Sequence, residues 1–292
     1  MGLKALAGIL RAAVVGFIHD RAMSMGAAMA YYTLFSLAPV LVIVIAVAGM
    51  VFGREAAQGA IVNELADLLG ADGARAVEAM IASAGQTGSG VLAAIVGIVA
   101  FLLGATTAFI ELQESLNTIW RAPPAWGSIV LTLLRDRLLS LAVVLGLGFL
   151  LLVSLVIGAG ITAFAQLIDR WAPGLSFLMG VVNFAVSFVV TTLLFAFIYK
   201  VLPRVEILWR DVLAGAVLAA LLFMLGRWAI AFYIGQTRLA SSYGAASTVI
   251  LVMVWVYYSS QILFLGAEFS RAWCLHRAAR RAAAAGITPP AA

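Results

Sequence analysis

The last apolar stretch of the sequence carries polar side chains at a spacing that could do chemistry. Tyr257, Gln261, Phe264 and Glu268 follow one another at steps of four, three and four residues, so one helix face presents a phenol, an amide and a carboxylate. Ionisable groups at bilayer depth are costly, and they mark candidate binding or proton-relay sites. Because Arg271 follows Glu268 closely, pairing with a neighbouring base is the alternative interpretation.

A second candidate face lies on the first apolar stretch. Tyr32, Ser36 and Pro39 fall at i, i+4 and i+7 and therefore share one face of a helix. Polar groups and a proline inside a bilayer need partners from other helices. Two interpretations stay open with equal weight: a face that lines a substrate path, or packing contacts with a proline kink.

Further candidates stand out by their place relative to the apolar stretches. Arg227 lies within one of them, about 9 Å from its outer end by the rise per residue, and could bind an anionic group, pair with an acid or extend outward. Glu111 lies at the inner end of another, level with Glu268. The two form either a cation or proton entrance or two separate interfacial charges, and we favour the second. Asn117 follows in the same polar segment, and Tyr243 belongs to a polar turn that could open the external end of a pathway.

The sequence offers little for an enzyme, a metal site or a cofactor. It has no Gly-rich phosphate loop, no CxxC and no HExxH motif, and both histidines, His19 and His276, fall outside the apolar stretches. We interpret His19, beside Asp20, as a solvated or headgroup-contacting side chain. The single cysteine, Cys274, excludes an internal disulfide and a multi-cysteine metal site. We therefore expect no catalytic residue, no metal and no cofactor.

The elements that must position these residues are membrane-spanning helices. The chain is 64% hydrophobic and 11% charged with a mean hydropathy of +1.11, whereas soluble domains carry about 25% charged residues. We predict an all-α, polytopic membrane protein that forms a single membrane domain over residues 1–271. Its six transmembrane helices are expected at about 27–52, 91–110, 138–164, 177–199, 212–233 and 245–269.

Three further segments complete the predicted architecture. Residues 2–25 predict an N-terminal amphipathic helix on the membrane surface. Residues 53–86 mix charged and apolar positions at helical spacing, which predicts an external helical hairpin between spans 1 and 2. The hairpin is either a cap over an external opening or, as we favour, a connector. The second span should end near Glu111, with Trp120 anchoring the next turn, and residues 272–292 form a basic cytosolic tail.

The distribution of Lys and Arg orients the chain. With both termini in the cytosol, the outer segments hold few of the 18 basic residues, namely Arg54, Arg75, Arg170 and Arg238. This asymmetry follows the positive-inside rule, so the basic pI of 9.7 is a topology signal and we expect no nucleic-acid partner. We expect membrane lipids as partners, with anionic headgroups at the basic tail, and we leave open whether the protein is a homo-oligomer.

Five motifs in order carry a family resemblance: AYYTLFSLAP at 30–39, LNTIW at 116–120, WRD at 209–211 followed by Gly215 and Ala216, YGA at 243–245, and QILFLGAEF at 261–269. Together they resemble the YihY / virulence factor BrkB family of bacterial inner-membrane proteins. The resemblance implies a six-span protein of the bacterial inner membrane, whose relatives are labelled either ribonuclease BN or a transporter linked to serum resistance. It implies no catalytic residues. A metal-dependent nuclease would need clustered His and carboxylates that this sequence does not offer.

Our leading functional hypothesis is a transporter or lipid-handling protein, because the first and last spans carry polar faces and Arg227 lies within the membrane. The alternative is a non-transporting scaffold for envelope assembly, in which those faces join helices or subunits. A membrane-embedded hydrolase is a distant third.

Overall fold

The computed structural model describes residues 3–53, 55–56, 58–59, 61–63, 78, 106–123, 176–236 and 245–284. Within these ranges the chain is helical and has no strand, which confirms the predicted all-α class. The helices are α1 (Leu3–His19), α2 (Ala22–Phe52), α6 (Ser176–Val201), α7 (Trp209–Gln236) and α9 (Ala245–Ala284). Residues 106–119 form one further helical segment, called the 106–119 helix below.

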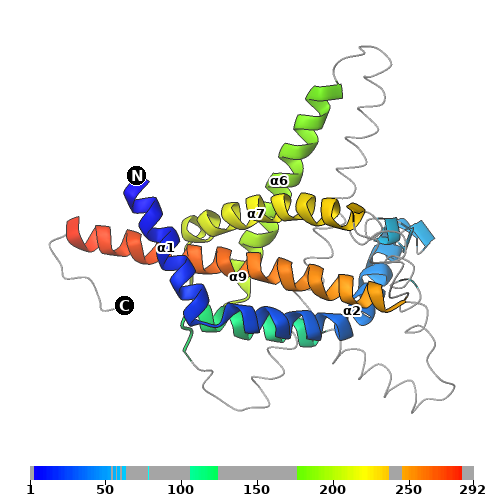
Figure 1. Cartoon of the computed structure of the whole chain (residues 1–292), viewed down its shortest axis with the longest axis horizontal. Helices are drawn as coiled ribbons and strands as arrows, with labels where there is room; N and C mark the ends of the chain where they lie inside the picture. The colour runs from blue at the N-terminus through cyan, green and yellow to red at the C-terminus, as the bar shows by residue number, and fades with distance from the viewer. Residues whose placement is uncertain are drawn as a thin grey trace.

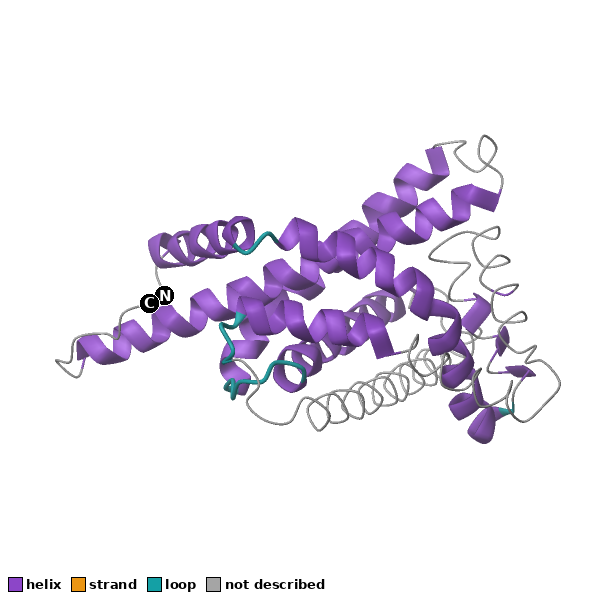
Figure 2. Ribbon diagram, turned by 90° about the horizontal axis from the view of Figure 1, so that it is seen from below, coloured by secondary structure: helices purple, strands orange, loops and turns teal. Residues whose placement is uncertain are grey.

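Helix α9 is the centre of the arrangement. It contacts α1, α2 and α7, whereas α6 contacts α7. Figure 1 shows α7 in yellow along one side of α9 and α2 in blue along the other, with α1 crossing α9. Figure 2 shows the same helices from below, with few loops among the described residues. Among the helices that the structure describes, the polar face predicted on 245–269 therefore belongs to the one that packs against three others.

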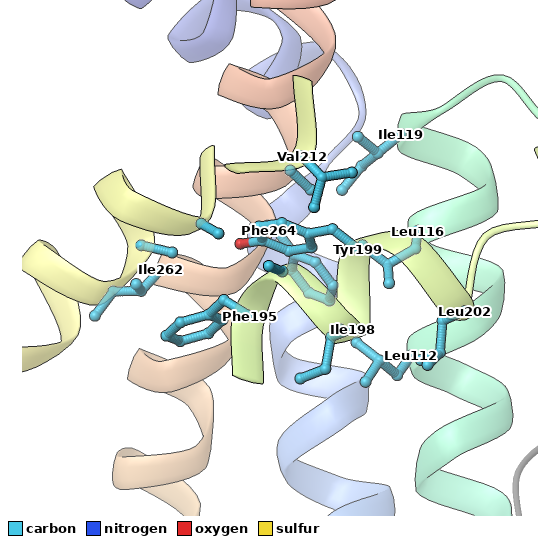
Figure 3. Packing of buried hydrophobic residues seen from close by; sticks show 14 of the residues in the cluster. Leu112, Leu116, Ile119, Phe195, Ile198, Tyr199, Leu202, Val212, Ile262 and Phe264 are labelled. Atoms are coloured by element: carbon cyan, nitrogen blue, oxygen red, sulfur yellow. The ribbon is translucent and has the colours of Figure 1, made fainter. Parts of the chain in front are cut away.

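The core gathers where α6, α7, α9 and the 106–119 helix meet (Figure 3). Tyr199 and Phe264 are its largest fully buried side chains. The Tyr199 hydroxyl donates a hydrogen bond to the carbonyl of Leu263 over 2.7 Å, so its polar end is satisfied inside the core. The 106–119 helix packs into the same cluster through three fully or nearly fully buried side chains, Leu112, Leu116 and Ile119.

Small residues bring α7 and α9 close together. A side chain at Gly215 would collide with the carbonyl of Gly266 and with Ser270, so this crossing requires glycine. Ser270 Oγ donates to the carbonyl of Val212 over 3.3 Å. Close packing between helices is how membrane proteins gain stability without a hydrophobic driving force between spans.

Two described helices are long and apolar enough to cross a membrane. They are Gly180–Val201, with a mean hydropathy of 2.3, and Trp209–Arg227, with 1.6. They overlap the predicted spans 177–199 and 212–233. Helix α7 exposes an apolar stripe at steps of four residues, Leu213, Val217, Leu221 and Leu225. Such a stripe on a core helix fits contact with lipid acyl chains.

Helix ends differ from the boundaries suggested by hydropathy. Helix α1 ends at His19 and α2 begins at Ala22, five residues before the predicted start of the first span, because Arg21 takes a left-handed conformation with φ of 54°. The helix that contains the predicted end of the second span does not stop at Glu111. The helix continues to residue 119 because its polar side chains find partners on neighbouring segments.

Helix α9 runs without a break from the predicted sixth span through most of the predicted tail, to Ala284. Alanine and arginine, which dominate its last turns, are strong helix formers. The predicted span 138–164 lies outside the described residues, as do most of the 53–86 hairpin and most of the 91–110 span.

Candidate functional site

Two glycines on neighbouring helices receive the polar side chains of α9. A Cβ atom at Gly16 of α1 would collide with the carboxyl group of Glu268, and one at Gly26 of α2 would collide with the amide of Gln261. The Tyr257 ring also lies at Gly26, 3.6 Å from such an atom. The phenol, amide and carboxylate of the predicted face therefore point toward α1 and α2, while Phe264 belongs to the apolar core.

Glu268, the carboxylate of this face, is buried, with 2% of its surface exposed. Its Oε1 atom is buried and has no hydrogen-bond donor among the described residues. The neighbouring carboxyl group that acts on it is that of Asp20, one turn after Gly16 at the end of α1. Glu268 forms no ion pair with Arg271 among the described residues, although the positive charge of Arg271 acts on it. Glu111 is not among the groups that act on Glu268.

Asp20 is held at the junction of α1 and α2. Its side chain is 1% exposed, and its Oδ1 accepts hydrogen bonds from Arg121 Nη2 at 2.6 Å and from His19 Nδ1 at 3.0 Å. Burial raises the pKa of Asp20, but the hydrogen bonds from His19 and Arg121 outweigh that effect and hold the pKa below its usual value. The exposed side chain of His19 agrees with the solvated position expected for it, whereas its neighbour Asp20 is buried.

Arg121 reaches Asp20 from a tight turn. The 106–119 helix is followed by a turn at Trp120 and Arg121, and Arg121 adopts a left-handed backbone with φ of 51°, which non-glycine residues rarely do. Its Nη1 also donates to the carbonyl of Thr118 over 3.1 Å. A strained backbone held in place by its surroundings is common at functional sites.

Asn117 fixes that turn rather than facing the buried carboxyl groups. Its backbone carbonyl accepts from the amide of Ala122 over 2.9 Å, and its side-chain Oδ1 accepts from the amide of Arg204 over 2.8 Å. Gln113, one turn earlier, donates to the carbonyl of Leu202 over 3.0 Å. These bonds hold the 106–119 helix to the segment after α6, and so they set where Arg121 lies.

Gln261 differs from Gln113 in having no such partner. Both its amide nitrogen and its amide oxygen are buried without a hydrogen-bond partner among the described residues. By the rise of an α-helix it lies about 10 Å along α9 from Glu268. The polar groups therefore follow one line, from the exposed His19 through Asp20 and Glu268 to Gln261.

The other sequence-predicted residues do not join this line. Ser36 is buried but donates to the carbonyl of Thr33, in its own helix, over 3.2 Å. The half-buried Tyr32 packs edge-on against Tyr31, with ring centroids 5.5 Å apart. Tyr243 and the side chain of Pro39 lie outside the described residues.

Two predicted residues lie apart from the Asp20 and Glu268 pair. Arg227 is exposed on α7 and makes no ion pair with any described residue, so its role stays a prediction. Glu111 is half-buried within the 106–119 helix. Within the described residues, no three His, Cys, Asp or Glu side chains gather in a way that could hold a metal ion.

Sequence reasoning missed Asp20 and Arg121 as partners of Glu268. The signals present were weak: a dipeptide His-Asp at the end of α1 and an Arg after an LNTIW motif. Asp211 is in the first turn of α7, 3% exposed, and binds Arg277 of α9 over 2.5 Å.

The long apolar helices and the apolar stripe on α7 are typical of an α-helical membrane protein, and the buried polar groups form a site at the junction of α1 and α9. Comparison with known proteins identifies the family: the family model described as virulence factor BrkB matches residues 13–286. The chain belongs to this family.

Known relatives agree with the membrane class. The chain is 29% identical over 276 residues to a UPF0761 membrane protein of Stenotrophomonas maltophilia strain R551-3, covering 89% of this chain and 59% of the relative. It is 27% identical over 271 residues to a UPF0761 membrane protein of Alkalilimnicola ehrlichii, covering 92% and 58%. The chain thus spans about three fifths of the length of these relatives. No solved structure matches it.

Proposed function

We propose that this chain is a transporter or lipid-handling protein of the bacterial inner membrane, and that the face of α9 carrying Tyr257, Gln261 and Glu268 lines part of its path. The observation that carries the proposal is the amide of Gln261, which is buried with neither of its polar atoms paired among the described residues. An unpaired amide in an apolar surrounding costs roughly 1–3 kcal/mol on protein scales. A group used only to join helices would be expected to have its partner, as Gln113 does.

The proposed orientation places both termini in the cytosol. Helix α1 exposes an apolar face, Leu6, Leu10, Val14, Val15 and Ile18, and packs its other face on α9 through Ile9 and Ala13. An amphipathic helix of this kind lies in the headgroup region. The end of α9 carries Arg277, Arg280 and Arg281, which would face anionic headgroups on the same side.

The rival function, a non-transporting scaffold, makes a different prediction for the same residue. The helices stay packed in either case. Only if the face lines a path should a substitution of Gln261 reduce activity more than it reduces stability. No catalytic step is part of either model.

The test uses the purified chain in native nanodiscs, with bound lipids identified by mass spectrometry, followed by a lipid-flipping assay in proteoliposomes. Gln261→Leu should remove an enriched lipid and slow its movement while the melting temperature stays unchanged or rises. Gln113→Leu is the matched control, since it should lower the melting temperature while leaving the enriched lipid in place. No enriched lipid in the wild type, together with no flipping, would contradict the lipid version and favour the scaffold.

A further inference from the structure

The carboxyl groups of Asp20 and Glu268 lie together although they are far apart in the sequence. Glu268 packs on Gly16 where α1 crosses α9 (Figure 1), and Asp20, whose backbone amide donates to the carbonyl of Gly16 over 2.8 Å, follows one turn later at the end of α1. Asp20 Oδ2 and Glu268 Oε1 are both buried with no donor from the described residues. Two ionised carboxylates accept hydrogen bonds but cannot donate them, so a bond between the two groups requires one bound proton.

The surroundings decide which carboxyl group carries that proton. Asp20 Oδ1 already accepts from Arg121 and from His19, and both contacts favour its ionised form. Glu268 Oε1 has no comparable donor among the described residues. Glu268 is therefore the acid that donates, and Asp20 is the carboxylate that accepts.

Charge balance gives the same result. The charged and titratable groups that act on the pair are Arg121 from its turn, His19 from α1 and Arg271 from α9. Arg121 is the cation hydrogen-bonded to the pair, whereas Arg271 makes no ion pair with either carboxyl group among the described residues, so with one proton the pair holds a single negative charge opposite Arg121. Without it, two negative charges would stand together in a site that water barely reaches, which is strongly unfavourable.

We propose that Asp20 and Glu268 form a proton-binding site, opened to the cytosol past Arg121 and His19, whose proton occupancy controls the fit of α1 against α9 at Gly16. The side chains of His19 and Arg121 are 77% and 45% exposed, so a proton can pass between the pair and water on that side. Loss of the proton from Glu268 to water breaks the carboxyl–carboxylate bond and leaves two like charges. The helices then separate at Gly16, or Arg121 moves to bridge both groups.

This site would supply the driving ion for the path along α9, and that part of the inference rests on the proposed function. Gln261 lies on the same face of α9, two turns from Glu268. Proton binding itself does not depend on what the protein moves, so it can be measured without a substrate.

The experiment is a pH titration of the full chain in nanodiscs. At each pH, infrared difference spectroscopy records the C=O stretch of protonated carboxylic acids. The wild type should show a band of a buried protonated acid that disappears as pH rises. Glu268→Gln should remove this band, and Asp20→Asn should change its frequency or midpoint. Glu114→Gln is the control, because Glu114 is a 52% exposed carboxylate paired with Arg204, and this variant should keep the band unchanged.

A second variant keeps the test decisive if Glu268→Gln does not fold. Arg121→Gly keeps the left-handed turn, because glycine adopts positive φ freely, and removes the cation. The midpoint of the band should move upward by about one pH unit or more, since an opposite charge close by favours the ionised form.

A wild type without a titrating acid band, or a band that survives Glu268→Gln, overturns the proton site even if lipid movement is found. A band with the expected changes but without lipid movement supports the site and counts against the proposed function alone.

Discussion

Glu268 of α9 lies directly on the backbone of α1 at Gly16, so closely that a single methyl group at position 16 would overlap its carboxyl group. Glu268 is 2% exposed, and Asp20, one turn after Gly16 on the same face of α1, completes the pair. The glycine is therefore what allows a carboxyl group of one helix to be buried against another helix. Substitutions around this contact, and a titration of the folded protein, should separate the contributions of its members.

Gly16→Ala should displace Glu268 and destabilise the protein. Added bulk in a packed site typically costs about 1–3 kcal/mol, although the carboxyl end of a side chain can shift to relieve part of it. The measurement is the thermal melting temperature in detergent, which should fall. Gly8→Ala is the matched control in the same helix, since nothing lies within 4 Å of a Cβ there. It should stabilise by roughly 0.5–1 kcal/mol, as alanine does in a helix interior. Equal effects of the two variants would show that Glu268 is not packed on Gly16.

Gln261→Leu and Gln113→Leu should differ in sign. Gln261 has no partner among the described residues, so leucine removes a buried polar group at no loss of a hydrogen bond. Gln113→Leu leaves the carbonyl of Leu202 without its donor, which costs roughly 1–3 kcal/mol. Denaturation of both variants in the same detergent gives the comparison. A large loss of stability in Gln261→Leu would indicate that its amide is paired.

Arg277→Ala should cost more stability than Glu114→Gln. Asp211 is 3% exposed and its partner across α7 and α9 is Arg277, so the substitution leaves a buried carboxylate without its cation. The expected loss is about 2 kcal/mol, reduced from the fully buried case because Arg277 itself is 25% exposed. The Glu114–Arg204 pair is more exposed and should contribute at most about 1 kcal/mol. The double variant Asp211→Asn with Arg277→Ala should recover part of the loss.

Acid should destabilise the wild type through Asp20. The pKa of Asp20 is lower in the folded protein than its ordinary value of 3.8. The stabilisation is therefore present above that value and is lost as the pH falls through the lower, folded-state pKa. Melting temperatures recorded from pH 6 downward should drop at the acid end, and Asp20→Asn should flatten that part of the curve while lowering the plateau. An unchanged acid limb in Asp20→Asn would contradict the pairing with Arg121 and His19.

Much of the candidate site was within reach of the sequence. The spacing of Tyr257, Gln261 and Glu268 places three polar side chains on one helix face, because side-chain direction in a helix follows from a fixed rotation per residue. Composition indicates lipid as the solvent, and uninterrupted apolar stretches of about 20 residues or more indicate helices, because the strands of a membrane barrel alternate apolar and polar residues.

The partners of those side chains were decided by tertiary structure. Asp20, Arg121 and Glu268 are brought together from three segments by the crossing of α1 over α9 and by the left-handed turn at Arg121. Neither the crossing nor the turn follows from a local sequence pattern. The crossing depends on glycines such as Gly16 that leave room for a side chain of another helix, and the sequence does not distinguish them from other glycines of membrane helices. The turn depends on hydrogen bonds that Asn117 accepts from residues outside its helix. Local periodicity therefore determined which face is polar, and only long-range packing decided that its carboxylate meets a second one.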